Sequence, residues 1–418
     1  MQNFRSHQKR SFDRGFSRFG KPNFSKPAHG KFSSRPRYSN SQNSRRHNRG
    51  EVIDIQRFVK KAVPNTATNH VKIIHNFADF SFSQKINMNL KEIGYETPTP
   101  IQDQSIGHVM SGRDILGLAN TGTGKTAAFL LPLIDKCFRD KNQKVLIIAP
   151  TRELAQQINV EFRKFAKGMG IYSAICVGGV PIYRQISDLR SHPNFVIGTP
   201  GRLKDLKDRA NINFSFFQNI VLDEIDRMLD MGFVDEIKRI LAELPDKRQS
   251  LFFSATLPIK IETLVREFLI NPVIVKTITG ETAANVDQDI VKVHADNKFN
   301  RLTDILSKEG SKKVLIFSET KRDVEKLTKN LAESGFRADS IHGDKRQNQR
   351  QKALSKFRDD QIQILVATDV AARGLDISNV SHVINYTIPQ TYNDYIHRIG
   401  RTGRGNNKGF ALTFVEAN

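Results

Sequence analysis

One glycine-rich segment of this 418-residue chain has the residue types and spacing that hold nucleotide phosphates. Residues 119–126 read ANTGTGKT, between an apolar run and an apolar helical stretch. Gly122 and Gly124 allow backbone N–H groups to curl around phosphate oxygens at a helix start. Lys125 suits the β- and γ-phosphates, and the Thr126 hydroxyl suits Mg²⁺. The predicted nucleotide contacts are Thr121, Gly122, Thr123, Gly124, Lys125 and Thr126.

A second segment, residues 219–226, reads NIVLDEID and places two adjacent carboxylates at the end of an apolar strand. On its own, such a pair is explained equally well as two solvated acids at the end of a strand. Downstream of a phosphate loop it predicts hydrolysis. Asp223 then holds Mg²⁺ through water, and Glu224 positions and deprotonates the attacking water.

The choice of base rests on residues 94–102, which read GYETPTPIQ. A glutamine amide can pair with the N6 and N7 edge of adenine, so Gln102 is the predicted base reader. Phe77 and Tyr95 offer aromatic rings for stacking on the base. The guanine-reading pattern NKxD is absent from the sequence. We therefore expect ATP, with Mg²⁺, as the nucleotide.

The elements that position these residues are short apolar runs that alternate with helical stretches. Such runs indicate buried parallel strands covered by helices on both faces, an α/β fold. The pattern occurs twice, so we expect a first domain over residues 67–276, a linker over 277–287 and a second domain over 288–418. The expected strands lie within residues 114–119, 145–150, 195–200, 219–224, 250–256, 313–320, 340–344, 363–369, 382–387 and 410–416.

Residues 1–66 are predicted to be a disordered basic tail. The first fifty residues hold thirteen Lys and Arg against one acid, with no helical or strand period. Such a segment buries too little apolar surface to offset its ordering entropy. Phenylalanines alternate with arginines along it, which is the chemistry of single-strand RNA binding. A solubilising tail and a mitochondrial-type transit peptide are the alternatives.

The overall composition limits the classes of partner and the cellular compartment that we expect. The net charge of +22 favours a polyanion, most commonly nucleic acid. Cys137 and Cys176 are too few for a disulfide framework or a zinc site, which fits a reduced compartment. The sequence has no apolar run of membrane-spanning length and no secretory signal. We expect a cytoplasmic protein without a membrane partner.

With these segments in order, the chain resembles a DEAD-box RNA helicase over about residues 75–416. Residues 94–102 are similar to the family's adenine-reading Q motif, residues 119–126 to its motif I, and DEID at 223–226 stands where the family has DEAD. The resemblance implies two tandem RecA-like domains. It also implies RNA contacts in the first domain at Pro150, Thr151, Arg152, Gly178, Gly179, Thr199 and Arg202. Asp226, Ser254 and Thr256 would couple the two domains.

The second domain carries further likenesses to the same family. Residues 367–376 resemble motif V, which implies RNA contact at Thr368 and ATP ribose contact at Asp376. Gln347 would couple the domains and Arg350 would contact RNA. Residues 397–404, HRIGRTGR, resemble motif VI, which implies coupling by His397 and catalytic fingers on the γ-phosphate at Arg401 and Arg404.

The activity that the resemblance implies is ATP-dependent RNA unwinding. RNA bound across both domains would close them, complete the ATP site and separate a short duplex locally. An ATP-gated RNA clamp with little unwinding is one alternative, and a DNA-directed translocase is another. We expect a monomer that contacts the backbone of RNA without reading its sequence. Ribonucleoprotein or ribosome-assembly proteins are further expected partners.

Two departures from the family pattern carry expectations of their own. Ile225 replaces the small Ala of DEAD and adds three carbons beside the carboxylates. We expect it to point into the core rather than into a cleft between the domains, which requires smaller neighbours. The sequence ends at Asn418, after the last expected strand, where relatives continue into a helix. We expect a minimal or truncated copy, or a dispensable final helix.

Overall fold

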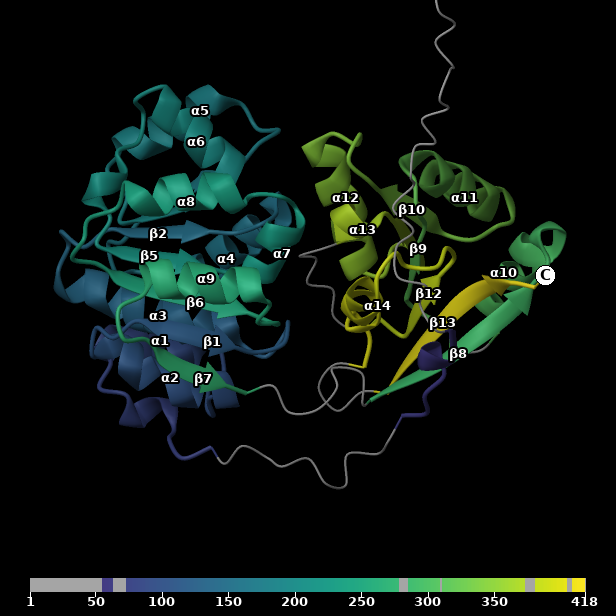
Figure 1. Ribbon diagram of the computed structural model, residues 1–418, viewed down its shortest axis with the longest axis horizontal. Coiled ribbons are helices and arrows are strands. Elements are labelled where there is room, and N and C mark those ends of the chain that lie inside the picture. The colour runs from purple at the N-terminus through teal and green to yellow at the C-terminus, as the bar shows by residue number, and fades with distance from the viewer. Residues whose placement is uncertain are drawn as a thin grey trace, which may run out of the picture. The chain divides into compact units, whose positions relative to one another are not determined.

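The computed structural model describes residues 55–62, 73–277, 285–308, 310–372, 380–403 and 408–417. Residues 50–418 form one compact unit. Its strands fall into two sheets, which define a first domain (residues 73–277) and a second domain (residues 285–417) (Figure 1). Most of the predicted tail, residues 1–54 and 63–66, and most of the predicted linker, residues 278–284, lie outside the described residues.

The first domain has seven parallel strands in the order β3-β4-β2-β5-β6-β1-β7. This order places β5, β6 and β1 side by side, so the segments that follow them meet at one edge of the sheet. The strands are β1 Ile115–Leu118, β2 Val145–Ile148, β3 Ser173–Cys176, β4 Phe195–Gly198, β5 Asn219–Leu222, β6 Gln249–Ser254 and β7 Val273–Lys276. The helices are α1 Gln84–Glu92, α2 Pro100–Met110, α3 Lys125–Arg139, α4 Arg152–Phe165, α5 Ile182–Arg190, α6 Pro200–Asp208, α7 Ile225–Asp230, α8 Val234–Ala242 and α9 Ile259–Phe268, with short 3₁₀ turns at Phe77–Asp79 and Phe214–Phe216.

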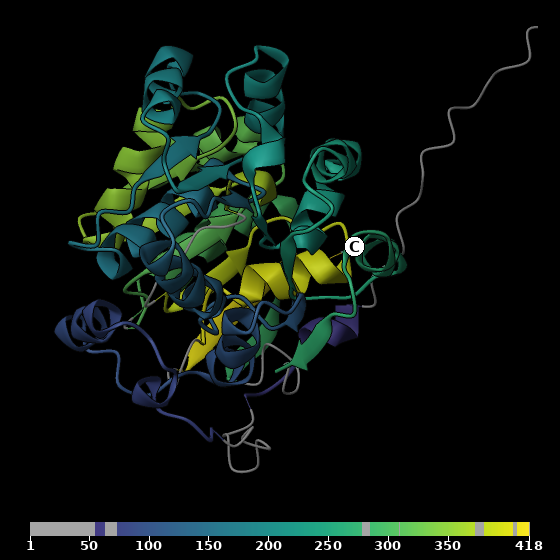
Figure 2. The same ribbon diagram turned by 90° about the vertical axis from the view of Figure 1, so that its left-hand side faces the viewer.

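The second domain has six parallel strands in the order β10-β11-β9-β12-β13-β8. The strands are β8 Val286–Val293, β9 Val314–Phe317, β10 Ala338–Ile341, β11 Ile364–Ala367, β12 His382–Asn385 and β13 Gly409–Glu416. The helices are α10 Lys298–Leu306, α11 Lys321–Glu333, α12 Gln347–Arg358, α13 Asp369–Ala372 and α14 Tyr392–Ile399, with a 3₁₀ turn at Ala295–Asn297. Figure 2 shows the ribbon of Figure 1 turned by 90°.

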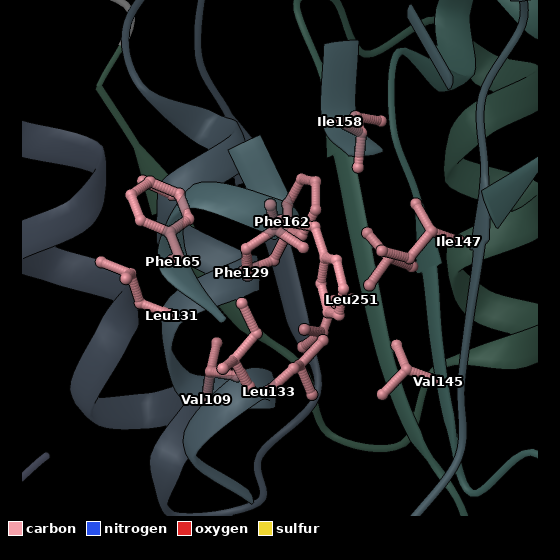
Figure 3. Packing of buried hydrophobic residues seen from close by; sticks show 14 of the residues in the cluster. Val109, Phe129, Leu131, Leu133, Val145, Ile147, Ile158, Phe162, Phe165 and Leu251 are labelled. Carbon is pink, nitrogen blue, oxygen red and sulfur yellow. The ribbon is translucent and has the colours of Figure 1, made fainter. Parts of the chain in front are cut away.

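Alternate residues of each buried strand build separate cores on the two faces of the first sheet. Ile115 and Val145 face one core, which α1, α2, α3 and α4 cover. Their neighbours Leu116 and Leu146 face the other, which α6, α7, α8 and α9 cover. Figure 3 shows side chains of the first of these cores, among them Phe129 of α3, Phe162 of α4 and Leu251 of β6. This alternation is the period-2 geometry of a strand buried on both sides.

Three strands are absent from the predicted runs, and all three lie at sheet edges. β3 and β7 are the edges of the first sheet, and β8 is an edge of the second. β8 mixes buried, intermediate and exposed residues and begins at Val286, inside the predicted linker. An edge strand is covered on fewer sides, so it does not need the continuous apolar run by which central strands are recognised.

Part of the predicted tail packs onto the second domain. Ile55–Phe58 form a 3₁₀ helix, and Lys60 pairs with Gln288 of β8 in an antiparallel bridge (Figure 1). The sequences differ in composition: residues 51–62 contain Val, Ile and Phe, whereas the first fifty residues contain no Val, Ile or Leu. The Phe58 side chain is fully buried. Among the described residues, no helix has the length and apolar character needed to cross a membrane.

Candidate nucleotide and RNA site

The phosphate loop joins the end of β1 to α3, which begins at Lys125. Gly122 and Gly124 have φ values of 83° and 93°, a region that side chains with a Cβ disfavour. At Gly124 a Cβ would also lie 2.4 Å from Nε2 of Gln102. The loop therefore presents its backbone at a helix N-terminus, where N–H groups and the helix dipole favour an anion.

Gln102 lies against this loop with both ends of its amide engaged. Its Nε2 donates to the Gly124 carbonyl at 3.0 Å, and its Oε1 accepts from the Thr99 N–H at 2.9 Å. An amide has two donor hydrogens and two acceptor lone pairs, so one of each remains for a base. The residue predicted to read adenine thus also supports the phosphate loop, a role that the sequence pattern does not indicate.

The two aromatic residues predicted to stack on the base occupy different environments. Phe77 is only 4% exposed and packs in the first core, 5.9 Å from Tyr95 between ring centroids. Tyr95 is partly exposed and lines the large cavity described below. Burial raises the pKa of the Tyr95 hydroxyl above its ordinary value. Phe77 supports Tyr95 from the core side, and Tyr95 presents the ring to the cavity.

Lys125 and Asp223 are buried charged residues with polar atoms that lack partners. Within the described residues, neither Lys125 Nζ nor Asp223 Oδ1 has a hydrogen-bond partner. Burial raises the pKa of Asp223 to about 6, while the charge of Lys125 opposes that rise. Buried polar atoms without partners are costly, so such a pair fits a ligand of complementary charge. Phosphate oxygens suit Lys125, and Mg²⁺ suits Asp223.

Glu224 is held in a strained conformation at the start of α7. Its φ and ψ are 54° and 52°, in the left-handed region, which a residue with a Cβ disfavours. Arg227 Nη1 donates to Glu224 Oε2 at 2.5 Å, and both side chains are buried. Sequence reasoning missed Arg227. Its spacing of three residues on the same helix is the signal that could have identified it.

Asp226 joins α7 to the segment after β6. Its Oδ2 accepts from the N–H groups of Ala255 and Thr256 and from the Thr256 hydroxyl, at 3.1, 3.0 and 3.1 Å. Ser254 instead donates to the Thr256 carbonyl at 2.7 Å. The three coupling residues predicted in the first domain are therefore brought together. Ile225 lies between Glu224 and Asp226 and is fully buried in the core that α6, α7, α8 and α9 cover, so the expected core placement is confirmed.

The residues predicted to contact RNA in the first domain gather after β2, β3 and β4. Arg152 packs on Gly178 and Gly179, where a Cβ on Gly179 would lie 2.2 Å from an Arg152 nitrogen. Burial lowers the pKa of Arg152, and the nearby charges of Arg350 and Arg202 act in the same direction. Thr199 and Pro200 start α6, with Arg202 in its first turn, while Pro150 and Thr151 lead into α4. Clustered guanidinium groups of this kind suit phosphate oxygens.

Glu153, a residue that sequence reasoning did not single out, holds two predicted site residues of α12. Its Oε1 accepts from Gln347 Nε2 at 3.2 Å and pairs with Arg350 Nη2 at 2.8 Å. Glu153 and Gln347 are buried. The Glu153 carboxylate therefore positions Arg350 close to Arg152. The only sequence signal for Glu153 is its place in residues 150–154, PTREL, beside the predicted RNA contacts.

Two arginines, Arg398 on α14 and Arg401 just after it, lie in different surroundings. Arg398 makes a bidentate pair with Asp369 through bonds of 2.6 Å each, and also donates to Asn385 Oδ1 and the Thr387 carbonyl. Arg401, just beyond the helix, is buried and lines the cavity. His397 lies on α14, and Thr368 immediately precedes α13. Arg404 and Asp376 lie outside the described residues.

A cavity of about 1040 Å³ collects much of the predicted ATP site. The part of its lining that matters here comprises Thr121, Gly122, Lys125, Asp223, Glu224 and Arg401. A glycine-rich loop, a strand-end carboxylate and an arginine from the second domain thus face one space. A glycine-rich phosphate loop with an arginine facing it is typical of nucleoside triphosphatases.

Comparisons with known proteins specify the family. Residues 99–264 match the DEAD/DEAH box helicase family, and residues 297–406 match the helicase conserved C-terminal domain. The chain belongs to the DEAD/DEAH box helicases, so the family predicted from the motifs and the two RecA-like domains is confirmed. A similar protein is the ATP-dependent RNA helicase CshA of Listeria monocytogenes, 44% identical over 342 residues. The match spans 81% of this chain but only 66% of that relative, just under two thirds.

Solved structures of the family have the same fold. S. cerevisiae Dbp5 bound to RNA and ADP BeF3 is 28% identical with a TM-score of 0.74, covering 82% of this chain and 90% of that one. The DEAD-box helicase Mss116 bound to ssRNA and UDP-BeF is 29% identical with a TM-score of 0.74, covering 81% and 74%.

Proposed function

We propose that this chain is an ATP-dependent RNA helicase, in which RNA stimulates ATP hydrolysis and the cycle separates short duplexes or remodels RNA–protein complexes. One observation carries the proposal: Lys125 and Asp223 hold buried polar atoms that have no hydrogen-bond partner among the described residues, beside a cavity that Arg401 also lines. The names of the relatives support it, because CshA is an ATP-dependent RNA helicase and Dbp5 and Mss116 bind RNA with nucleotide analogues.

The nucleotide contacts follow from the site in the first domain. The phosphate loop, from Thr121 to Thr126, binds the phosphates, with Lys125 at the β- and γ-phosphates. Gln102 reads adenine with the donor and acceptor that its bonds to Gly124 and Thr99 leave available. Magnesium, when bound, would be held at Thr126 and Asp223 and would neutralise charge on the phosphate oxygens. Asp376, outside the described residues, is proposed for the ribose.

Hydrolysis falls to Glu224 and the arginines of the second domain. Glu224 orients the attacking water and accepts its proton, and the ion pair with Arg227 fixes the carboxylate in place. Arg401 stabilises the negative charge that develops on the γ-phosphate, together with Arg404. Because these groups come from both domains, turnover depends on how the domains are held together.

RNA binds through its phosphates and sugars, without base reading. Arg152, Arg202 and Arg350 supply the charge, supported by Thr151, Thr199, Thr368 and the backbone at Pro150, Gly178 and Gly179. Asp226, Ser254, Thr256, Gln347 and His397 couple this surface to the ATP site. Such contacts predict affinity that falls steeply with salt and depends little on sequence.

One assay separates this function from its alternatives. ATP turnover of the full chain is measured with single-stranded RNA, with DNA and with neither, alongside strand separation of a short RNA duplex. A helicase shows RNA-specific stimulation together with ATP-dependent strand separation. Stimulation without strand separation would identify an RNA clamp, and equal stimulation by DNA would identify a DNA translocase. A monomeric state, ribonucleoprotein or ribosome-assembly partners and a cytoplasmic location remain proposals from the sequence.

A further inference from the structure

The segment of residues 55–62 is attached to the second domain at three points. Phe58 is fully buried, and its ring centroid lies 4.4 Å from that of Tyr395. Lys60 exchanges both backbone hydrogen bonds with Gln288, at 3.0 and 2.7 Å. The Ala62 N–H donates to Asp287 Oδ1 at 2.7 Å. A side-chain anchor combined with paired backbone bonds fixes both the position and the register of the segment.

These contacts converge on α14. Tyr395, in the middle of that helix, packs on Phe58 and donates its hydroxyl to Gln288 Oε1 at 2.9 Å. Gln288 is the residue whose backbone holds Lys60. Phe58, Tyr395 and Ile399 belong to one buried cluster with Val286 of β8 and Ala411 of β13. The segment therefore covers one face of α14 and secures it to the edge of the sheet.

The other face of α14, and its C-terminal end, are equally constrained. Arg398 holds α14 to α13 through Asp369. Beyond the helix, the Arg401 and Thr402 N–H groups donate to the carbonyls of Arg398 and Ile399 at 3.2 and 3.1 Å. At Gly403 a Cβ would lie 2.6 Å from Cγ2 of Val286. The backbone that carries Arg401 is therefore packed against the same strand start that the segment binds.

We propose that residues 55–62 form a docked positioning segment of the second domain, with Phe58 as its anchor, that sets α14 and through it Arg401. Phe58 does not reach the cavity and is not catalytic; it acts through Tyr395. The inference rests on the proposed role of Arg401 in hydrolysis. The alternative is that residues 55–62 only shield the edge of β8. In that case the segment would stabilise the fold without affecting the catalytic rate constant of the folded enzyme.

The test compares Phe58→Ala with Val59→Ala in the full chain. Val59 is the adjacent residue and is 48% exposed, so its truncation serves as the matched control. At a temperature where circular dichroism shows both variants folded, we expect Phe58→Ala to lower RNA-stimulated kcat about tenfold, because small displacements of a catalytic group are costly. The affinity for a fluorescent ATP analogue, which the first domain holds, should match that of Val59→Ala.

A second pair of variants covers the case in which Phe58→Ala fails to fold. Lys60→Pro removes the N–H that bonds Gln288, whereas Lys61→Pro alters a residue for which the described structure records no hydrogen bond. We expect only Lys60→Pro to lower kcat at unchanged nucleotide affinity. Folded Phe58→Ala and Lys60→Pro with the kcat of their controls would overturn the positioning role. An unmodified chain without RNA-stimulated hydrolysis would instead refute the proposed function.

Discussion

Residues 223–226 in the first domain and residues 398–401 in the second have a feature in common. Each segment contains one charged residue that is bonded within the protein and one that lines the cavity. Asp226 accepts four hydrogen bonds, and Arg398 makes four bonds within its own domain. Asp223 keeps an oxygen without a partner in the described part of the chain, and Arg401 lines the cavity. In each segment, one charged residue is bonded within the fold and another, three residues away, lines the cavity.

The cavity-facing arginine provides the strongest test of this division. Arg401→Ala should lower RNA-stimulated ATP turnover about 1,000-fold or more, since arginine fingers contribute on this scale. Nucleotide binding, measured by fluorescence titration, should persist because the phosphate loop is intact. Arg322→Ala on α11, an exposed arginine of the same domain, is the control and should stay within about twofold of the unmodified rate. Retained turnover in Arg401→Ala would disprove the split site.

On the side of the first domain, Glu224→Gln should lower turnover about 100-fold or more, because a general base is lost while size is kept. The amide can still accept a hydrogen bond from Arg227 but no longer balances its buried charge, so the midpoint of urea unfolding should fall. Rapid-quench measurement of a single turnover gives the rate of the chemical step directly. A step as fast as in the unmodified chain would remove Glu224 from the catalytic role.

The fold-facing arginine should show the opposite profile. Arg398→Ala leaves Asp369 and Asn385 without their partner and should lower the free energy of unfolding by about 3 kcal/mol, as for other broken buried pairs. Urea unfolding followed by circular dichroism measures this loss. Arg398→Lys keeps the charge but not the fork, and should recover only part of the stability. Unchanged stability in both variants would erase the distinction between Arg398 and Arg401.

Ile225→Ala probes the residue between the two kinds of carboxylate. Because Ile225 is fully buried in the second core, its truncation should lower the free energy of unfolding by about 2 kcal/mol. The coupling of ATP turnover to RNA should change by less than about tenfold. A larger change in coupling, with stability retained, would show that the isoleucine acts on the site and not only on packing.

The smallest expected signal concerns the two thiols. Burial raises the pKa of Cys137 and of Cys176 to about 12. Raising the pH from 7 to 9 therefore leaves both protonated in the folded protein, and the reactive thiolate stays scarce. Mass spectrometry should show no iodoacetamide adduct on the native chain across this range, and two adducts after denaturation in urea. Labelling of the native chain that rises with pH would contradict their burial.

The central strands and the position of the glycine loop between β1 and α3 were predictable because both follow local rules. A strand buried on both faces must be apolar throughout, and a phosphate loop must have glycines where φ is positive. The edge strands β3, β7 and β8 escaped prediction because partial exposure removes the apolar run. Arg227 and Arg398 escaped because a polar side chain does not reveal in its sequence whether it faces protein or ligand. Phe58 escaped because its partners lie more than 200 residues away, on β8 and α14.

The left-handed backbone conformation of Glu224 lowers the stability of the fold at a position where the proposed chemistry requires a carboxylate. An L-residue in that conformation costs about 1 to 2 kcal/mol, and a glycine would relieve most of it. Glycine, however, has no carboxylate to orient water or to pair with Arg227. The segment thus retains a side chain that its backbone disfavours, so selection for stability alone would replace Glu224 and selection for turnover would restore it.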